Sequence, residues 1–301
     1  GELRILKGTK TSAWASGGDM NTARQALGSA GIQTAALAFG GSTDPPFTRV
    51  GITEQYDGSS WTEVADLNTA RDEVGSNGTY TSALMYGGFN PGSLANTESW
   101  NGSAWTEVAD LNNNRSRLAG AGADNTSGLA IGGDNPAGGG SSGEYFNQTE
   151  SWNGSSWTEV SDLNTARRFL AGAGVVPSAL AFGGSASSRY ANTEAWNGSN
   201  WYEVNDLNTA RETLAGAGAS EDSSLAFGGD TPGVTGKTET WNGASWTETS
   251  DLNTARSILA GTGTSTTALA FGGVFNPPAR TAATEEWNAD FAYGVWATGG
   301  S

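Results

Sequence analysis

Asp-Leu-Asn-Thr-Ala-Arg, the stretch from Asp66 to Arg71, decides the fold of this chain because it recurs along its whole length. Intact copies stand at Asp162–Arg167, Asp206–Arg211 and Asp251–Arg256, and varied copies at Asp19–Arg24 (Met for Leu) and Asp110–Arg115 (Asn-Asn for Thr-Ala). The final arginines are separated by 47, 44, 52, 44 and 45 residues. A period of about 40 to 50 residues is typical of stacked supersecondary units. We therefore expect residues 1–301 to form one repetitive domain.

Each repeat contains four short stretches that have the character of β-strands. In one copy these are Leu170–Gly174, Ala179–Gly184, Thr193–Trp196 and Asn200–Val204. The first is built from small residues, the second is apolar and ends in a glycine pair, and the last two flank Asn197-Gly198. Asn-Gly between two alternating, aromatic-bearing runs is a strong hairpin signal, because a tight β-turn needs positive φ angles. We name the four strands a to d in chain order.

Six such units predict an all-β protein, since no window has the 3.6-residue apolar period of a helix. A four-stranded sheet cannot bury both of its faces alone. Six sheets packed face to face around an axis can do so, and that arrangement is a six-bladed β-propeller of antiparallel blades. The small a strands suit the crowded centre, and the tryptophans suit the wider spaces between blades.

A closed propeller usually completes its last blade with a strand from the other terminus, which removes the exposed sheet edges. Residues Trp14–Asn21 align with Trp61–Asn68, so the N-terminal segment carries a d strand without its own a to c strands. We expect Trp14 to dock beside Trp287 in the last blade. The tail offers a rival, because Trp296–Gly300 echoes the sequence that begins at Trp14. We favour the N-terminal strand and expect residues 289–301 to form an extra outer strand or to cover an edge.

The repeat resembles the kelch repeat in four features: a glycine pair, a variable loop, a Glu-x-aromatic strand, and a Trp followed by an Arg-containing link. The glycine pairs are Gly40-Gly41, Gly87-Gly88, Gly132-Gly133, Gly183-Gly184, Gly228-Gly229 and Gly272-Gly273. The c-strand glutamates are Glu54, Glu98, Glu150, Glu194, Glu239 and Glu285, each followed two residues later by Trp, or by Tyr56 in one repeat. The d-strand tryptophans are Trp61, Trp105, Trp157, Trp201 and Trp246. Kelch repeats usually carry Tyr where five of these six carry Trp, so the chain resembles a divergent kelch-like array of the kind met in bacterial and phage sequences.

Composition excludes several classes of site. The chain has no cysteine and no histidine, so it cannot form a thiolate nucleophile, a Cys/His zinc site or a Ser-His-Asp triad. The copper site of some kelch-like oxidases is excluded for the same reason, and we expect no cofactor and no metal. The net charge of −16 is unfavourable for nucleic-acid binding. No apolar run is long enough to span a membrane, and no signal-peptide core is present. We expect a monomer, with an extracellular or virion-associated location favoured.

The loops between strands b and c vary most between repeats, and variable loops on a rigid scaffold are the usual home of recognition. These loops span Ser42 to Ile52, Phe89 to Asn96, Asp134 to Gln148, Ser185 to Asn192, Asp230 to Lys237 and Val274 to Ala283. Aromatic and arginine side chains are enriched in binding hot spots. The candidate ligand contacts are Phe47, Arg49, Phe89, Tyr145, Phe146, Arg189, Tyr190, Phe275 and Arg280. The longest loop, with Tyr145-Phe146 beside a Gly-rich segment, is the first candidate.

The repeated arginines form a second group, and antiparallel order places them on the same face as the b–c loops. They are Arg24, Arg71, Arg115, Arg167, Arg211 and Arg256. A ring of guanidinium groups at the channel mouth could hold a carboxylate or sulfate. Their near-identity favours a structural role instead, in which each pairs with a glutamate of a neighbouring blade or with link carbonyls.

We therefore predict a non-catalytic recognition module that binds a glycan or a protein through the b–c loops. The first alternative is a purely structural or engineered repeat propeller without a ligand. The second is a carbohydrate-active enzyme that uses loop carboxylates such as Asp44, Glu144, Glu221 and Asp222. Calcium at Asp134 or Asp230 is less favoured than ordinary solvated turns.

Overall fold

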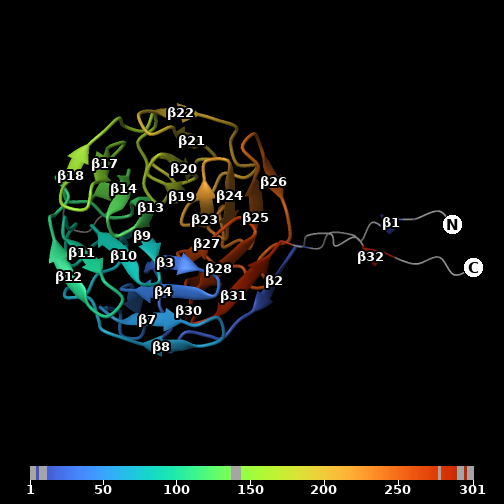
Figure 1. Cartoon of the computed structure of the whole chain (residues 1–301), viewed down its shortest axis with the longest axis horizontal. Coiled ribbons are helices and arrows are strands. Elements are labelled where there is room, and N and C mark those ends of the chain that lie inside the picture. Colours follow the sequence, from blue (N-terminus) through green and yellow to red (C-terminus); the bar gives the residue numbers. More distant parts are fainter. Residues whose placement is uncertain (1–4, 7–11, 137–143, 277–278, 290–294, 297–301) are drawn as a thin grey trace, which may run out of the picture.

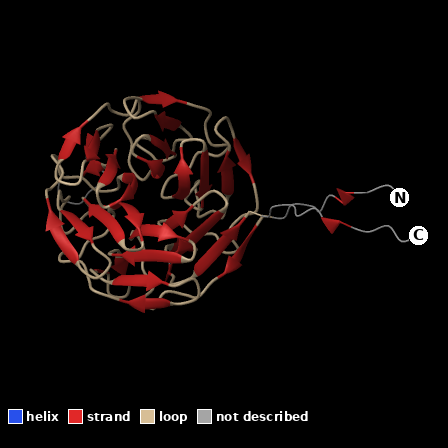
Figure 2. Cartoon of the chain, in the orientation of Figure 1, coloured by secondary structure: helices blue, strands red, loops and turns tan. Residues whose placement is uncertain are grey.

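The computed structural model describes residues 5–6, 12–136, 144–276, 279–289 and 295–296, and these residues form an all-β six-bladed propeller. Figures 1 and 2 show the six blades around a central axis, with strands and connecting loops as the regular features. Each blade is a four-stranded antiparallel sheet. The sequence prediction of fold class is confirmed.

The four strands of each blade run from the axis to the outer rim. The innermost a strands are β3 (Gly28–Ile32), β9 (Gly75–Thr79), β13 (Ala119–Asp124), β19 (Ala171–Val175), β23 (Ala215–Ser220) and β27 (Ala260–Gly263). The b strands are β4 (Ala35–Phe39), β10 (Ser82–Tyr86), β14 (Ser127–Ile131), β20 (Ser178–Phe182), β24 (Ser223–Phe227) and β28 (Thr267–Phe271). The c strands are β7 (Thr53–Tyr56), β11 (Thr97–Trp100), β17 (Thr149–Trp152), β21 (Thr193–Trp196), β25 (Thr238–Trp241) and β31 (Thr284–Asn288). The d strands are β8 (Trp61–Glu63), β12 (Trp105–Val108), β18 (Trp157–Glu159), β22 (Trp201–Glu203), β26 (Trp246–Glu248) and, for the last blade, β2 (Ala13–Ser16).

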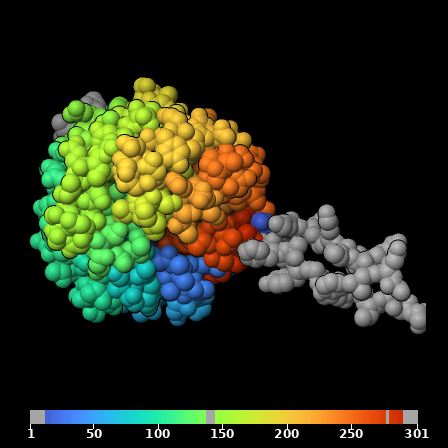
Figure 3. Space-filling model, turned by 45° about the horizontal axis from the view of Figure 1, so that its top comes forward, coloured from blue at the N-terminus to red at the C-terminus, as the bar shows by residue number. Residues whose placement is uncertain are grey.

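The N-terminal strand closes the ring, as its alignment with the other d strands predicts. β2 pairs antiparallel with β31, and Trp14 stands opposite Trp287. In Figure 3 the first blade, in blue, adjoins the last blade, in red. The expected outer strand in the tail is not found among the described residues, because β32 (Val295–Trp296) pairs with β1 (Ile5–Leu6) instead of with a blade.

Three b–c loops contain short ribbons of their own. These are β5 (Ser42–Thr43) with β6 (Thr48–Arg49), β15 (Asp134–Asn135) with β16 (Glu144–Tyr145), and β29 (Val274–Phe275) with β30 (Ala279–Arg280). They lie on the face where the links between blades also lie, since link and loop backbones are hydrogen-bonded, as in Leu67 N–H to the Gly51 carbonyl at 2.9 Å. We call this face the loop face.

The core lies between blades and is dominated by the d-strand tryptophans. Trp105 packs edge-on against Phe39 of the preceding blade at 4.8 Å between centroids, and its indole N–H donates to the Thr53 hydroxyl at 3.0 Å. The same indole-to-threonine bond recurs around the ring, and Trp14 donates to Thr238 at 3.0 Å. A buried indole N–H needs such a partner. The tryptophan therefore joins two blades by packing and by a specific polar bond.

Candidate functional site

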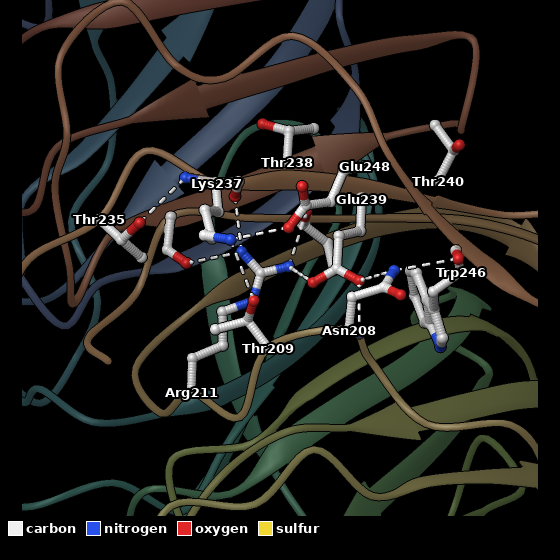
Figure 4. Close-up of polar contacts among 12 residues, drawn as sticks. Asn208, Thr209, Arg211, Thr235, Lys237, Thr238, Glu239, Thr240, Trp246 and Glu248 are labelled. Carbon is white, nitrogen blue, oxygen red and sulfur yellow. Dashed lines mark hydrogen bonds and ion pairs between the residues drawn. The ribbon is translucent and has the colours of Figure 1, made fainter. Parts of the chain in front are cut away.

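The six repeated arginines are fully buried inside the blades. Arg211 shows the arrangement (Figure 4): its guanidinium pairs with Glu239 at 2.9 Å and donates to the Lys237 and Gly228 carbonyls. Asn208 of the same link donates its backbone N–H and its side-chain amide to the other Glu239 oxygen at 2.7 and 2.8 Å. The glutamate is on the c strand of the blade that the link enters, not on a neighbouring blade. The link therefore fastens itself to its next blade through one carboxylate.

Burial alone lowers the pKa of Arg211, and the charge of Glu239 opposes that effect. A buried cation needs such a partner, because its desolvation is otherwise very costly. The guanidinium groups therefore form bonds inside the blades and are not available to a ligand. They do not line the mouth of the central channel, so the proposed anion-binding ring of arginines does not exist in this structure.

The residues that do surround the channel mouth stand two positions after each arginine. We call them the mouth ring: Ala26, Glu73, Arg117, Phe169, Thr213 and Ile258. Their backbones form a closed circle of six hydrogen bonds, in which each N–H donates to the mouth-ring carbonyl of the preceding blade at 2.9 or 3.0 Å. Ala26 completes the circle by donating to Ile258.

All six mouth-ring residues have left-handed backbone conformations, with φ between 54° and 58°. This region is unfavourable for residues with a side chain, and most of all for β-branched ones such as Thr213 and Ile258. The conformation turns each N–H toward the neighbouring blade, so the hydrogen-bond circle offsets the strain. Strained positions held by their surroundings cluster at functional sites.

A network of charges covers one side of the mouth. The Arg117 guanidinium donates to Glu73 at 2.9 Å and to Asp134 at 3.1 Å, and Arg168 donates to the same Asp134 oxygen at 2.8 Å. Burial raises the pKa of Glu73, Arg117 opposes this, and neighbouring Asp72 raises it further. The other side of the mouth carries no charged side chain in the ring.

Arginine–aromatic stacking ties the predicted loop residues together. Arg49 lies 5.1 Å from the ring centroid of Phe47 and 4.7 Å from that of Phe89, and Arg280 of the last blade lies 5.4 Å from Phe47. Tyr145 lies 5.2 Å from Arg168. Phe47 is half exposed, whereas Phe89 is buried. The structure therefore brings Phe47, Arg49, Phe89 and Arg280 into one cluster and places Tyr145 in a second.

The remaining predicted residues are more separate. Arg189 pairs with Glu212 at 3.2 Å and with Asp230 at 2.5 Å. No stacking contact joins Phe146, Tyr190 or Phe275 to the two clusters within the part of the chain that is described. The Gly-rich segment expected beside Tyr145 falls on residues 137–143, which lie outside the described residues.

Sequence reasoning missed the mouth ring, although the repeat contains a signal for it. Within each link-to-strand block, no two copies carry the same pair of residues after the arginine, while Arg before the pair and Leu or Val after it hardly change. These pairs are Gln25-Ala26, Asp72-Glu73, Ser116-Arg117, Arg168-Phe169, Glu212-Thr213 and Ser257-Ile258. Variation confined to two positions of a repeated block marks positions at which the scaffold does not require one particular side chain.

The candidate catalytic carboxylates do not come together. Asp44 is paired with Arg280 at 2.8 Å in a b–c loop, and Glu144 is exposed on another such loop. Glu221 and Asp222 lie in the turn between β23 and β24, which is at the opposite end of the blade from the b–c loops. No cluster of three or more potential metal-binding side chains occurs among the described residues. Within those same residues, no helix has the length and apolar character needed to cross a membrane.

No protein-family model matches the chain, and no curated protein sequence matches it.

Proposed function

We propose that the propeller is a non-catalytic recognition module that binds a protein or a glycan through its loop face. One observation carries the proposal. Apart from the six buried scaffold arginines, every lysine and arginine of the described residues lies in the b–c loops or beside the mouth ring: Arg49, Arg117, Arg168, Arg189, Lys237 and Arg280.

This concentration of cations stands out against a net charge of −16. Glutamates such as Glu63 and Glu107 occupy the outer d strands, so the rim is acidic while the loop face carries both signs of charge. Mixed charge with exposed aromatic surface favours specific contact with a partner, and the acidic rim disfavours non-specific contact with polyanions.

We also assign the repeat to a divergent kelch type, supported by the roles of its motif residues. The glycine pair has positive φ angles, and a Cβ on Gly87 would lie 2.6 Å from the Arg115 carbonyl oxygen of the next link. The c-strand glutamate and the link arginine form the buried pair. We further propose that the propeller is monomeric and is displayed on a cell or virion surface. Light scattering on the purified chain tests the monomer.

The experiment is a binding screen of the purified propeller against a glycan array and a peptide-display library. Hits are then measured with Phe47→Ala, with Tyr145→Ala and Phe146→Ala combined, and with the matched control Tyr202→Ala. Phe47 and Tyr202 are comparably exposed, at 50% and 42%, but Tyr202 lies on the outer strand β22. We expect the loop variants to weaken binding about tenfold or more, as for hot-spot residues, and the control to leave it unchanged.

Equal affinities for Phe47→Ala, the Tyr145/Phe146 variant and Tyr202→Ala would overturn the assignment of the loop face. Absence of any hit would favour the structural alternative. Turnover of a bound glycan would favour the carbohydrate-active enzyme.

A further inference from the structure

A small pocket opens at the centre of the loop face, where the channel meets solvent. It has a volume of about 130 Å³ and is lined by the mouth ring and by the residues that follow each of its members. The residues that directly follow the mouth-ring residues in the sequence are Leu27, Val74, Leu118, Leu170, Leu214 and Leu259. We call this space the mouth pocket. We call these aliphatic residues its floor. All of them except Leu118 also line the wider channel below, so the mouth pocket and the channel meet at this circle of residues. The inner strands around the channel are visible in Figure 1.

The walls of the mouth pocket vary from blade to blade within a block of sequence that otherwise repeats closely. Six equivalent positions carry six different residues, whereas the aliphatic floor changes only once, from Leu to Val. The hydrogen-bond circle uses only backbone atoms, so it does not require one particular side chain at these positions. The scaffold therefore leaves the wall chemistry free to serve another purpose.

The charged side chains at the entrance of the mouth pocket are already paired with opposite charges of the protein. Glu73 and Arg117 are the two charged wall residues, and they are paired with each other. Arg117 is further held by Asp134, and Asp72 beside Glu73 is bound by Arg49 at 2.8 Å. A charged ligand would lose its hydration without gaining an unpaired opposite charge, and that loss is costly. The entrance of the mouth pocket is therefore complementary to an uncharged group of a ligand.

The pocket volume fits one side chain. An engineered protein cavity of about 150 Å³ lined by aliphatic and aromatic residues holds a benzene ring. The mouth pocket is of similar size and has walls of Phe169, Ile258, Ala26 and Thr213 above its aliphatic floor. A sugar ring of that size would place hydroxyl groups against this floor, where few hydrogen-bond partners exist to replace water.

An aromatic ligand in the mouth pocket could also contact the side of the pocket that carries Arg117 and Phe169. Arg117 and Arg168 lie 5.1 and 5.2 Å from the Phe169 ring centroid. A second ring in the pocket would lie beside Phe169 and within reach of Arg117. Offset ring–ring packing and guanidinium stacking each stabilise such contacts.

We propose that the mouth pocket takes one uncharged aromatic side chain, presented by a partner protein that lies on the loop face. This proposal rests on the proposed recognition function and narrows it, because it selects protein over glycan as the ligand of the central site. The partner anchors one ring at the axis, and the surrounding stacked arginine–aromatic clusters contact the rest of its surface.

The test uses toluene and p-cresol, which represent the Phe and Tyr side chains, with methyl glucoside and butylammonium as comparison probes. Binding to the full chain is followed by methyl NMR, with the Ile258, Leu214 and Leu259 methyl groups as reporters. Thr213→Phe fills the pocket with a residue that the equivalent position 169 already carries in the same backbone conformation, so it is expected to fold. Tyr202→Ala is the control.

We expect toluene and p-cresol to shift the reporter signals in a saturable manner, and Thr213→Phe to reduce that binding at least tenfold. Methyl glucoside and butylammonium should leave the signals unchanged. Saturable binding of methyl glucoside or butylammonium at these methyl groups, or toluene binding that survives Thr213→Phe, would overturn the proposal.

A second measurement separates a partner protein from a free small molecule. Peptides selected by display against the full chain should contain an aromatic residue and should bind Thr213→Phe at least tenfold more weakly. Peptides that bind Thr213→Phe normally would overturn the anchoring role even if toluene binds. The broader recognition function would still stand in that case if the same peptides were lost with Phe47→Ala.

Discussion

At the residue scale, the buried Arg–Glu pairs are the strongest polar contacts of the repeat. Each joins a link to the blade that follows it, and each is supported by an asparagine from the same link, as Asn208 supports Glu239. The pair is costly to bury, but removing one partner costs more, because the other charge is left alone in a dry interior.

We predict that Glu239→Ala lowers the free energy of unfolding by about 3–5 kcal/mol, because Arg211 loses its counter-charge. Chemical denaturation measures the change. Glu248→Ala in the same blade is the matched control: this exposed carboxylate pairs with Lys237 at 2.7 Å and should change stability far less. A similar loss in both variants would contradict the structural role of the buried pair.

The glycine pairs contain positions where the backbone conformation and a close contact favour glycine. Gly87 has φ +65° and faces the Arg115 carbonyl of the next blade, whereas a Cβ on Gly92 in the adjacent loop would meet no atom within 4 Å. We predict that Gly87→Ala costs at least about 1–2 kcal/mol from its left-handed backbone alone, with the close contact adding to this. Gly92→Ala should be nearly neutral. Thermal unfolding of the two variants tests the difference, and equal melting temperatures would count against it.

At the element scale, the first part of each link is hydrogen-bonded to the blade that the chain leaves, and the last part is bonded to the blade that it enters. Asp66 accepts from the Thr53 N–H of the blade that the chain leaves, at 3.2 Å. Asn68 and Arg71 bind Glu98 of the blade that it enters. The link thereby fixes the position of each blade relative to the next, which explains why its six copies are so similar.

The closing strand β2 has the same importance for the last blade. Deleting residues 1–18 removes Trp14 from its packing against Phe227 and Trp287. The loss of that side chain alone costs about 3–5 kcal/mol, so we expect the melting temperature to fall by roughly 10 °C. Deleting residues 291–301 should have a smaller effect, since it leaves all six blades complete. Differential scanning calorimetry compares the two deletions, and the reverse order would refute closure by β2.

At the scale of the whole molecule, closure makes the last blade equivalent to the others. Gly273 N–H of the last blade donates to the Arg24 carbonyl of the first link at 2.9 Å, as equivalent glycines do at the other blade boundaries. An open array has end repeats that unfold first, because each contacts a single neighbour. A closed ring has no such ends.

We therefore predict that Trp14→Ala and Trp157→Ala lower the stability of one common unfolding transition by similar amounts, about 3–5 kcal/mol each. Both indoles donate to a threonine at 3.0 Å and pack on two aromatic rings. Hydrogen exchange and calorimetry would detect a separate early step. Such a step in Trp14→Ala alone would show that the last blade is held less firmly than the rest.

Much of this architecture follows from local pattern. The glycine pairs occur in all six repeats, the Glu-x-Trp strands in five and the Asn-Gly turns in four, and this repetition predicts the ring. The placement of the arginines does not follow in the same way. Arg211 could reach the channel mouth or the blade interior from the same backbone position, and only the location of Glu239 decides between them.

By itself, the sequence determined the number of blades, the strand order and the closure by Trp14, because these depend on periodicity and on residues near each other in the repeat. The tertiary structure alone decided what surrounds the axis. The mouth ring is made of six residues, each about 45 positions from the next along the chain, and no two of them are of the same type: Ala26, Glu73, Arg117, Phe169, Thr213 and Ile258. They become one site because the ring brings six left-handed backbone positions together, and that convergence depends on packing between blades rather than on any local motif.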